Sequence, residues 1–335
     1  MSLSTLPPEL LDGVCQSLAT QDLVALSRTS STFYPVAQRL LYRHIHASSH
    51  ARNLSVVVTL AKRLDLASCV QSFSLVVDDA SPPVFPSFYR LLRKSLAAMQ
   101  ALKTLSLFIP PSMSWVLDSG AVRADPCYQR LEQFACSFPF DSDVTTFLGR
   151  TPALLELEVD SMPSLTPSPI PTLPSISIPH LAQFIGSSEQ AAAVVPGRPV
   201  ESVHLYGGDL TEDVMCSLSQ SVAPVIALGA NTTMSPISFL ESVTRHLPSI
   251  AFLRVTAENI DSVLPNAEWY QQIANKLDRL PNLSAFELSG IHWGSLKPQD
   301  QKQRVWQARP LSPLGFAADR EEDLDMMEPG DFMSN

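Results

Sequence analysis

LKTLSL, residues 102–107, is the clearest copy of a six-residue pattern that decides the fold of most of this chain. Its first, fourth and sixth positions are apolar, and the alternation at its end favours a short β-strand with one buried face. The pattern recurs from residue 70 onward. Its apolar positions are Val70-Phe73-Leu75, Leu102-Leu105-Leu107, Leu131-Phe134-Cys136, Leu154-Leu157-Val159, Val200-Val203-Leu205, Ile250-Leu253-Val255 and Leu283-Phe286-Leu288.

Two weaker copies, Leu181-Phe184 and Val222-Val225, lie in the longer gaps between these units. With them included, the copies are spaced by about 27 residues on average, a period that is typical of repeat architectures. The segments between the copies supply the return path from one strand to the next.

Four of these connecting segments have the apolar periodicity of a helix. Asp141 is a good N-cap for the second of them, and Leu-Pro at residues 247–248 and 280–281 ends the last two. We therefore predict an α/β fold in which strands and helices alternate as a solenoid; an ordinary α/β domain with similar buried strands is the alternative. The helical segments carry Phe88-Leu91-Leu92-Leu96-Met99, Val144-Phe147-Leu148, Ile237-Leu240-Val243-Leu247 and residues 267–280.

The N-terminal stretch LPPELLDGVCQSLATQDLVALSRTSSTFYPVAQRLLYRHI, residues 6–45, has a different pattern, which predicts three short amphipathic helices. In the first helix Leu11, Val14, Cys15 and Leu18 share one face. A unit of this size has no room for chemistry of its own and needs a partner surface. The second helix carries Leu23 and Leu26, and the third carries Phe33, Val36, Ala37, Leu40 and Leu41.

This stretch resembles the F-box, the module that attaches substrate receptors to a Skp-type adaptor in cullin-RING ubiquitin ligases. Residues 6–11, LPPELL, match the family's L-P-x-E-L-L start, and residues 22–26, DLVAL, match its central D-L-x-x-L. Phe33 stands where many members have Trp, and Ser30 replaces a frequent Cys. The resemblance implies an F-box over residues 1–46 that binds a Skp-type adaptor and a cullin scaffold. The implied adaptor-binding residues, some of which must instead pack the helices together, are Leu6, Pro7, Leu10, Leu11, Val14, Leu18, Leu23 and Leu26.

The body resembles the irregular leucine-rich repeats of many F-box proteins, which implies a leucine-rich-repeat-like domain over residues 70–300 after a connecting helical segment at 47–69. Regular repeats place Asn or Cys three residues beyond the L-x-L pair, where the side chain bonds the backbone along the turn. That ladder is missing here, so regular curvature does not follow from the resemblance. The residues at those positions are Pro110, Pro139, Met162, Gly208, Glu258 and Ile291.

Two segments have a biased composition. Residues 162–179, MPSLTPSPIPTLPSISIP, hold six prolines, which favour an extended surface loop. Thr166-Pro167 and Ser168-Pro169 in this loop are of the kind that proline-directed kinases modify. The C-terminal extension, residues 301–335, ends in the acidic stretch 319–331, which we expect to be a disordered solvating tail.

If the repeats stack, strand alternation places the side chains that flank each L-x-L pair on an open face. Thr104 and Ser106 belong to that face. Carboxylates beside an aromatic ring and an arginine form a candidate target-binding patch, because Tyr and Arg are favoured at interface hot spots. Ordinary solvated strand residues are the alternative. The candidate residues are Glu156, Glu158, Asp160, His204, Tyr206, Arg254 and Glu287.

The composition argues against several functional classes. The formal net charge of −10 and the absence of a basic cluster argue against nucleic-acid binding. Five scattered cysteines without a C-x-x-C pair indicate reduced thiols, mainly in the core. Neither a secretory signal nor an apolar run long enough to cross a membrane is visible. We expect an intracellular protein, cytoplasmic or nuclear, with no membrane partner.

The sequence has no established catalytic or phosphate-binding motif. His44, His46 and His50 lack neighbouring ligands for a metal site, and we interpret them as solvated imidazoles at a helix end. Asp141 and Asp143 fit helix capping better than acid–base catalysis.

We therefore expect no catalytic residues, metal or cofactor. The predicted function is a non-catalytic substrate-recognition adaptor of an SCF-type ubiquitin ligase, whose repeats bind a target protein. An interaction scaffold that acts outside ubiquitin ligation is the alternative.

Overall fold

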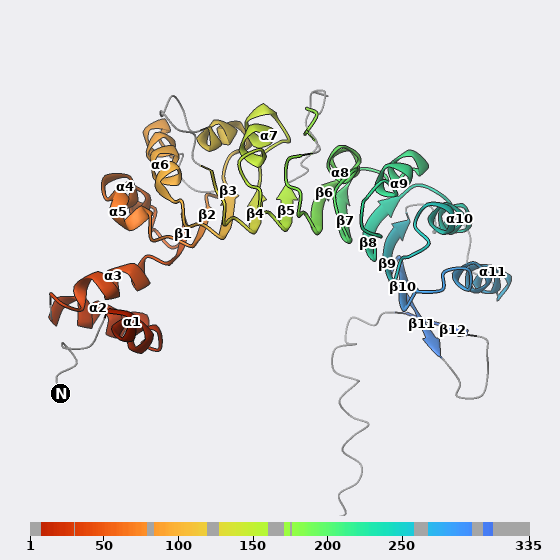
Figure 1. Ribbon diagram of the computed structural model, residues 1–335. Helices are drawn as coiled ribbons and strands as arrows, with labels where there is room; N and C mark the ends of the chain where they lie inside the picture. The colour runs from red at the N-terminus through yellow and green to blue at the C-terminus, as the bar shows by residue number, and fades with distance from the viewer. Residues whose placement is uncertain are drawn as a thin grey trace, which may run out of the picture.

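The computed structural model describes residues 8–29, 31–78, 84–118, 127–159, 171–174, 176–257, 267–296 and 304–310. Helices α1 (Pro8–Gln16), α2 (Thr20–Thr29) and α3 (Tyr34–Leu41) form a compact unit at one end. A long curved sheet follows, with helices along its outer side (Figure 1). The fold is therefore mixed α/β, with N-terminal helices and a strand-rich body.

The twelve strands of the described sheet lie in the same order as in the sequence. Neighbouring strands from β1 to β10 pair in parallel. Strand β11 pairs antiparallel with both β10 and β12, so the open sheet ends in an antiparallel hairpin. The strands are β1 (His44–Ser48), β2 (Ser72–Val76), β3 (Thr104–Phe108), β4 (Gln133–Cys136), β5 (Glu156–Val159), β6 (Gln183–Ser187), β7 (Ser202–Gly207), β8 (Ala227–Thr232), β9 (Phe252–Ala257), β10 (Ala285–Leu288), β11 (Ile291–Leu296) and β12 (Val305–Pro310).

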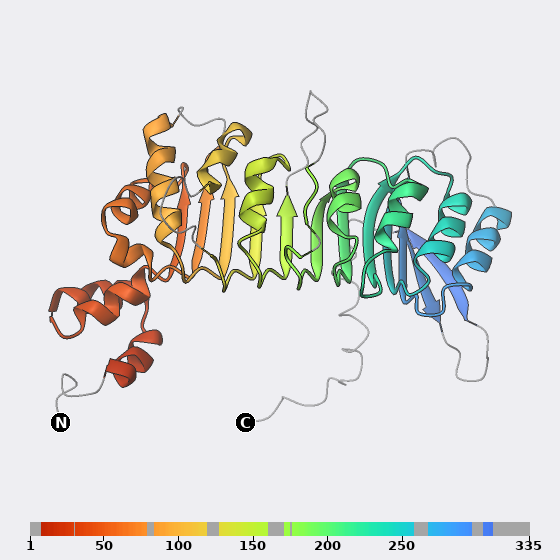
Figure 2. The ribbon, with the colours of Figure 1, turned by 45° about the horizontal axis from the view of Figure 1, so that its top comes forward.

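The helices that connect the parallel strands cover the outer face of the sheet, and the inner face carries none of the labelled helices (Figures 1 and 2). Asp141 caps α7 by accepting hydrogen bonds from the amides of Asp143 and Val144, which confirms its predicted N-cap role. The connecting elements are α4 (Ser55–Lys62), α5 (Leu64–Ala67), α6 (Pro86–Ala98), the 3-10 segment η2 (Pro111–Leu117), α7 (Ser142–Leu148), α8 (Ser188–Val194), α9 (Glu212–Leu218), α10 (Pro236–His246) and α11 (Ala267–Leu277).

The six-residue pattern occupies the same place in each unit. Its fourth position pairs in register from strand to strand, and every side chain in this row is 2% exposed or less. The row faces the helices, so one apolar position per unit builds a continuous core. It runs through Phe73, Leu105, Phe134, Leu157, Phe184, Val203, Leu228, Leu253 and Phe286.

The structure corrects the position of one weak copy. Val222 is exposed, and the unit that contains β8 starts at Val225, with Leu228 and Ala230 as its second and third buried positions. The small Ala230 at the last position explains why the pattern is weak in the sequence. The other weak copy, Leu181-Phe184, is buried and leads into β6.

The sheet extends beyond both ends of the predicted body. Strand β1 begins at His44, directly after the helical unit and well before residue 70, and pairs with β2. At the other end, β12 pairs with β11 although residues 301–335 were expected to be an extension. Strand β1 carries a copy of the pattern, Tyr42-Ile45-Ala47, with a small last residue, whereas β12 lies in the antiparallel hairpin and lacks the full pattern.

The predicted proline-rich loop falls mostly outside the described residues, but the described end of this loop, which leads to β6, is anchored by Arg198. This side chain is 1% exposed and donates hydrogen bonds to five backbone carbonyl oxygens, with no carboxylate among them. Two of these carbonyls belong to the last residue of α8 and to the second residue after that helix. The acceptors are Leu173, Pro174, Ser177, Val194 and Pro196.

Candidate interaction surfaces

Helix α1 has one buried and one exposed apolar face. Leu11 and Cys15 are 3% and 1% exposed, whereas Leu10 and Val14 are 57% and 49% exposed. Each pair has the four-residue spacing that places side chains one above the other on a helix. The buried pair packs into the core of the three helices, and the exposed pair forms an apolar strip on the outside.

An ion pair joins α1 to α3. The Arg39 guanidinium lies 2.6 Å from a carboxylate oxygen of Asp12, and the Gln16 amide donates to the same carboxylate at 3.1 Å. The hydrogen bond from Arg39 lowers the pKa of Asp12. Burial raises the pKa of the Cys15 thiol, because the surrounding core disfavours the thiolate.

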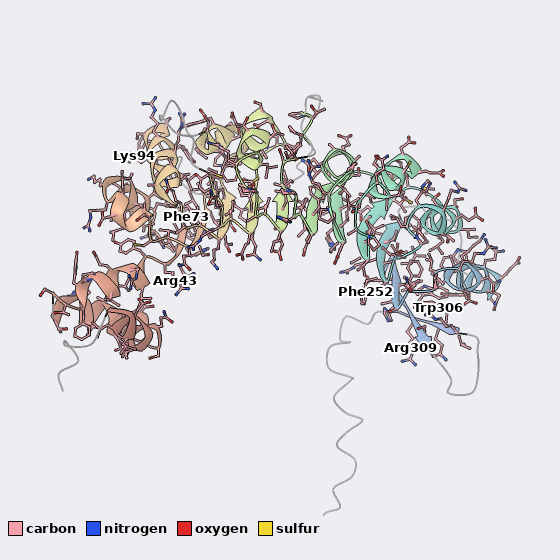
Figure 3. All side chains as sticks on the ribbon, viewed as in Figure 1. Arg43, Phe73, Lys94, Phe252, Trp306 and Arg309 are labelled. Carbon is pink, nitrogen blue, oxygen red and sulfur yellow. The ribbon has the colours of Figure 1, made fainter. Side chains whose placement is uncertain are left out.

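The inner face of the sheet carries the side chains that point away from the core. Phe73 lies between the strands and the helices, whereas Phe252, which is 54% exposed, lies on the opposite side of the sheet (Figure 3). One row of this face runs from strand to strand in register. From β1 to β12 it consists of His46, Ser74, Ser106, Ala135, Glu158, Ile185, His204, Gly229, Arg254, Glu287, His292 and Arg309.

A hollow of about 300 Å³ lies over strands β7 to β11 on this face, and we call it the larger hollow. Phe252 has Ala227 and Ala285 as its partners on the two neighbouring strands, so small side chains leave space on both sides of its ring. Arg254 lies two residues further along β9, with its Nε 3.2 Å from Glu287. The hollow is lined by Ser202, Val203, His204, Ala227, Leu228, Gly229, Phe252, Leu253, Arg254, Ala285, Phe286, Glu287 and His292.

Gly229 forms part of the floor of the larger hollow. A Cβ atom at this position would lie 2.5 Å from Nδ1 of His204, so the imidazole lies directly over the glycine backbone. Any larger residue would therefore move His204. The glycine allows an imidazole of one strand to cover the next strand.

A second hollow of about 180 Å³, the smaller hollow, lies over β3 to β6. Glu156 and Glu158 line it together with Gln133. The Gln133 amide donates to Glu156 at 2.8 Å and accepts from the Thr104 hydroxyl at 3.1 Å, which orients the carboxylate across the strands. This hollow is acidic, whereas the larger one holds an arginine and two histidines.

The two hollows account for five of the seven predicted target-binding residues. Tyr206 has another contact: its hydroxyl donates to the backbone oxygen of Val159 at 2.7 Å, which links β7 to the end of β5 across β6. Asp160 lies outside the described residues. Those that line a hollow are Glu156, Glu158, His204, Arg254 and Glu287.

Phe252, His292 and Arg309 were not among the predicted residues. Phe252 had a recognisable signal, because it occupies the position of the pattern where the earlier full copies have Ser72, Thr104, Gln133, Glu156 and Ser202. An exposed aromatic ring at this polar position is unusual for an open strand face. His292 and Arg309 lie in the terminal hairpin, outside the pattern, and their register depends on strand pairing.

The F-box-like family model matches residues 3–48 of this chain. Residues 3–48 thus form an F-box-like domain. The matched region covers α1, α2, α3 and the first strand of the sheet. No curated protein matches the chain.

Within the F-box-like domain, the predicted adaptor-binding residues separate into groups. Leu10 and Val14 form the exposed strip, whereas Leu11 and Leu23 belong to the buried core. Leu18 and Leu26 are half-buried against that core. Leu6 and Pro7 lie outside the described residues. The core is completed by Cys15, Val36 and Ala37, with Phe33, Leu40 and Leu41 packed around it.

The histidines after the F-box-like helices do not lie at a helix end, so that part of the interpretation was wrong, but their side chains are exposed, as expected of solvated imidazoles. His44 and His46 lie in β1 with exposed side chains, and Nε2 of His50 lies 3.0 Å from a carboxylate oxygen of Asp78. Within the part of the chain that the structure describes, no three His, Cys, Asp or Glu residues group as ligands for a metal.

All five cysteines are free. Cys15 and Cys136 are buried as predicted, while Cys127 and Cys216 are exposed and Cys69 is half-buried. Among the described residues, no helix has the length and apolar composition needed to cross a bilayer.

Proposed function

We propose that this chain is the non-catalytic substrate-recognition subunit of an SCF-type ubiquitin ligase. The observation that carries the proposal is the apolar strip of Leu10 and Val14 on the F-box-like domain. Two large apolar side chains are exposed on one helix face while their neighbours are buried. An F-box docks on a Skp-type adaptor, and burying this strip on the adaptor would remove its apolar surface from water.

The strand–helix array, in this proposal, is an irregular leucine-rich-repeat domain that holds the target protein on its inner face. The recurring six-residue pattern, its period and the in-register parallel strands support the assignment. The inner face carries Phe252 and Arg254 beside space for a partner side chain, and aromatic and arginine side chains dominate interface energetics.

Ubiquitin transfer is assigned to other subunits of the ligase. The chain contributes by binding two partners at once, which raises the effective concentration of the target's lysines near the ligase. We place the assembly in the cytoplasm or the nucleus, where unpaired cysteines such as the five of this chain stay reduced.

Replacing the exposed strip tests the adaptor half of the proposal. The double variant Leu10→Ala/Val14→Ala should lose at least about 2 kcal/mol of adaptor binding, roughly a thirtyfold loss of affinity. Capture of the Skp-type adaptor and cullin on the tagged full-length chain is the measurement. Val222→Ala is the matched control, because Val222 is also an exposed apolar residue but lies far from the F-box-like domain in the sequence.

The alternative is an interaction scaffold that acts outside ubiquitin ligation. It predicts that the unmodified chain captures adaptor without cullin, or captures neither. Either result would refute the ligase proposal, provided that the chain has a cooperative melting transition. Equal capture by the unmodified chain and the double variant would show that the strip is not the docking surface.

A further inference from the structure

The two halves of the inner face differ in charge. Glu156 and Glu158 of the smaller hollow form no ion pair among the described residues, and Glu156 is held by a neutral amide. Lys103, just outside this hollow, lies 3.9 Å from Glu132. The smaller hollow therefore presents two carboxylates to whatever occupies it.

The opposite half of the face is basic within a chain whose net charge is −10. Strands β7 to β12 carry Arg254, Arg309, His204 and His292, and Glu287 is their one carboxylate. Glu287 contacts Arg254 through Nε, yet the arginine side chain stays 67% exposed. Its outer edge can therefore still donate to a partner.

The apolar contact lies on the basic side. The Phe252 ring is exposed between Ala227 and Ala285, within the same hollow as Arg254. An aromatic ring beside a guanidinium fits a partner segment that combines an acidic group with an apolar side chain. The smaller hollow fits cations, because its free charges are carboxylates.

The spacing of the strands sets the distance between the two contacts. Four strand spacings of about 4.8 Å separate β5 from β9, roughly 19 Å in total. An extended polypeptide covers this distance with about six residues at about 3.3 Å each. The charges of the face therefore define the kind of charges in the partner, and the spacing of the strands defines the distance between them.

We propose that the inner face binds an extended segment of a partner protein in which a basic cluster and an acidic cluster with an apolar residue are separated by about six residues. The identification of this partner as a ligase target rests on the proposed function. The charge pattern itself rests on the sheet alone.

Three labelled twelve-residue peptides with one composition test the proposal. The first has three lysines, six Gly/Ser residues and then Glu-Phe-Glu; the second has the reverse order, since either chain direction fits; the third has its lysines and glutamates mixed. Binding to the full-length chain is measured by fluorescence anisotropy at low ionic strength. We expect one segregated peptide to bind at least about tenfold tighter than the mixed peptide.

The matched variant exchanges the charges of the two halves of the inner face and keeps the net charge: Glu156→Lys/Glu158→Lys/Arg254→Glu/Arg309→Glu. Its affinity for the preferred peptide should fall at least about tenfold, and it should instead bind the peptide of reverse order more tightly. Circular dichroism and the melting transition of the variant show whether it is folded. If it does not fold, it is replaced by two variants, each of which reverses the two charges on only one half of the inner face.

Equal affinity for segregated and mixed peptides, or no binding of any of the three, would overturn the inference. Preferred binding that arises only after deletion of residues 311–335 would also overturn it, because the chain's own acidic stretch would then be the occupant. Adaptor capture is measured on the same samples. Peptide discrimination without adaptor capture refutes the proposed function alone, and adaptor capture without discrimination refutes this inference alone.

Discussion

The F-box-like domain and the strand–helix array bury their apolar side chains in different ways. Five buried residues make up the core of α1 to α3, with the described array outside that cluster. The array has one continuous core from Ile45 to Trp306. A small core contributes little stability by itself, whereas each unit of the array is stabilised by its two neighbours. The comparison indicates that the F-box-like domain is the less stable of the two parts.

The largest expected effect comes from the core of the array. Phe184→Ala removes a fully buried ring from β6 and should lower the free energy of unfolding by about 3–5 kcal/mol. Urea unfolding followed by circular dichroism is the measurement. The matched control is Phe252→Ala, which removes the same ring from the exposed inner face and should cost far less. Similar losses for both variants would mean that the inner face is buried in solution.

A second large effect concerns the attachment of the segment before β6. Arg198→Met should cost about 2–4 kcal/mol, because backbone carbonyls lose their donor in a buried place. Arg198→Lys keeps the positive charge but lacks the planar set of N–H donors of the guanidinium, so it should recover only part of the lost free energy of unfolding. Full recovery with lysine would show that the charge, and not the set of hydrogen bonds, is what matters. The same urea unfolding measures all three proteins.

Neighbouring leucines of α1 separate stability from binding within the F-box-like domain. Leu11→Ala should cost about 2–3 kcal/mol in local stability, because it removes one of few buried side chains. Leu10→Ala should leave stability almost unchanged and weaken adaptor capture. Amide hydrogen exchange in α1 to α3 measures the first effect, with the array amides as internal reference. Faster exchange throughout the array in Leu11→Ala would show that the two cores are coupled.

The smallest effect is a pH dependence of the same domain. Since folding lowers the pKa of Asp12 below its ordinary 3.8, the ion pair with Arg39 stabilises the folded state above that value. This stabilisation is lost as the pH falls through the folded-state pKa. An exposed pair contributes at most about 1 kcal/mol. The protection factors of the α1 amides should therefore fall below pH 4 more in the unmodified chain than in Asp12→Asn; parallel pH profiles of the protection factors would contradict the assignment.

Much of the array could be predicted from the six-residue pattern. Leu105, Phe134 and Leu157 lie in one buried row because strand alternation is a local property of the backbone. The capping role of Asp141 is equally local. Strand β1 was missed because its copy of the pattern overlaps the stretch interpreted as the N-terminal helices, and β12 was missed because it pairs antiparallel and lacks the full pattern.

The candidate surfaces were less accessible to prediction. Leu10 and Leu11 are adjacent and chemically identical, and only the packing of α1 on α3 decides which of them is buried. The larger hollow depends on Ala227 and Gly229 of β8 and on Ala285 of β10, two strands that are far apart in the sequence. Their small size matters only beside Phe252, His204 and Arg254, so the hollow exists only after the strands pair in register.

By itself, the sequence determined the helical character of the N-terminal domain, the strand positions and the buried row, because these follow from the local spacing of apolar residues. The tertiary structure alone decided where the sheet begins and ends, which α1 leucines are exposed and where the two hollows lie. Those features depend on which side chains of different strands and helices meet after folding, and the local spacing of apolar residues does not determine that pairing.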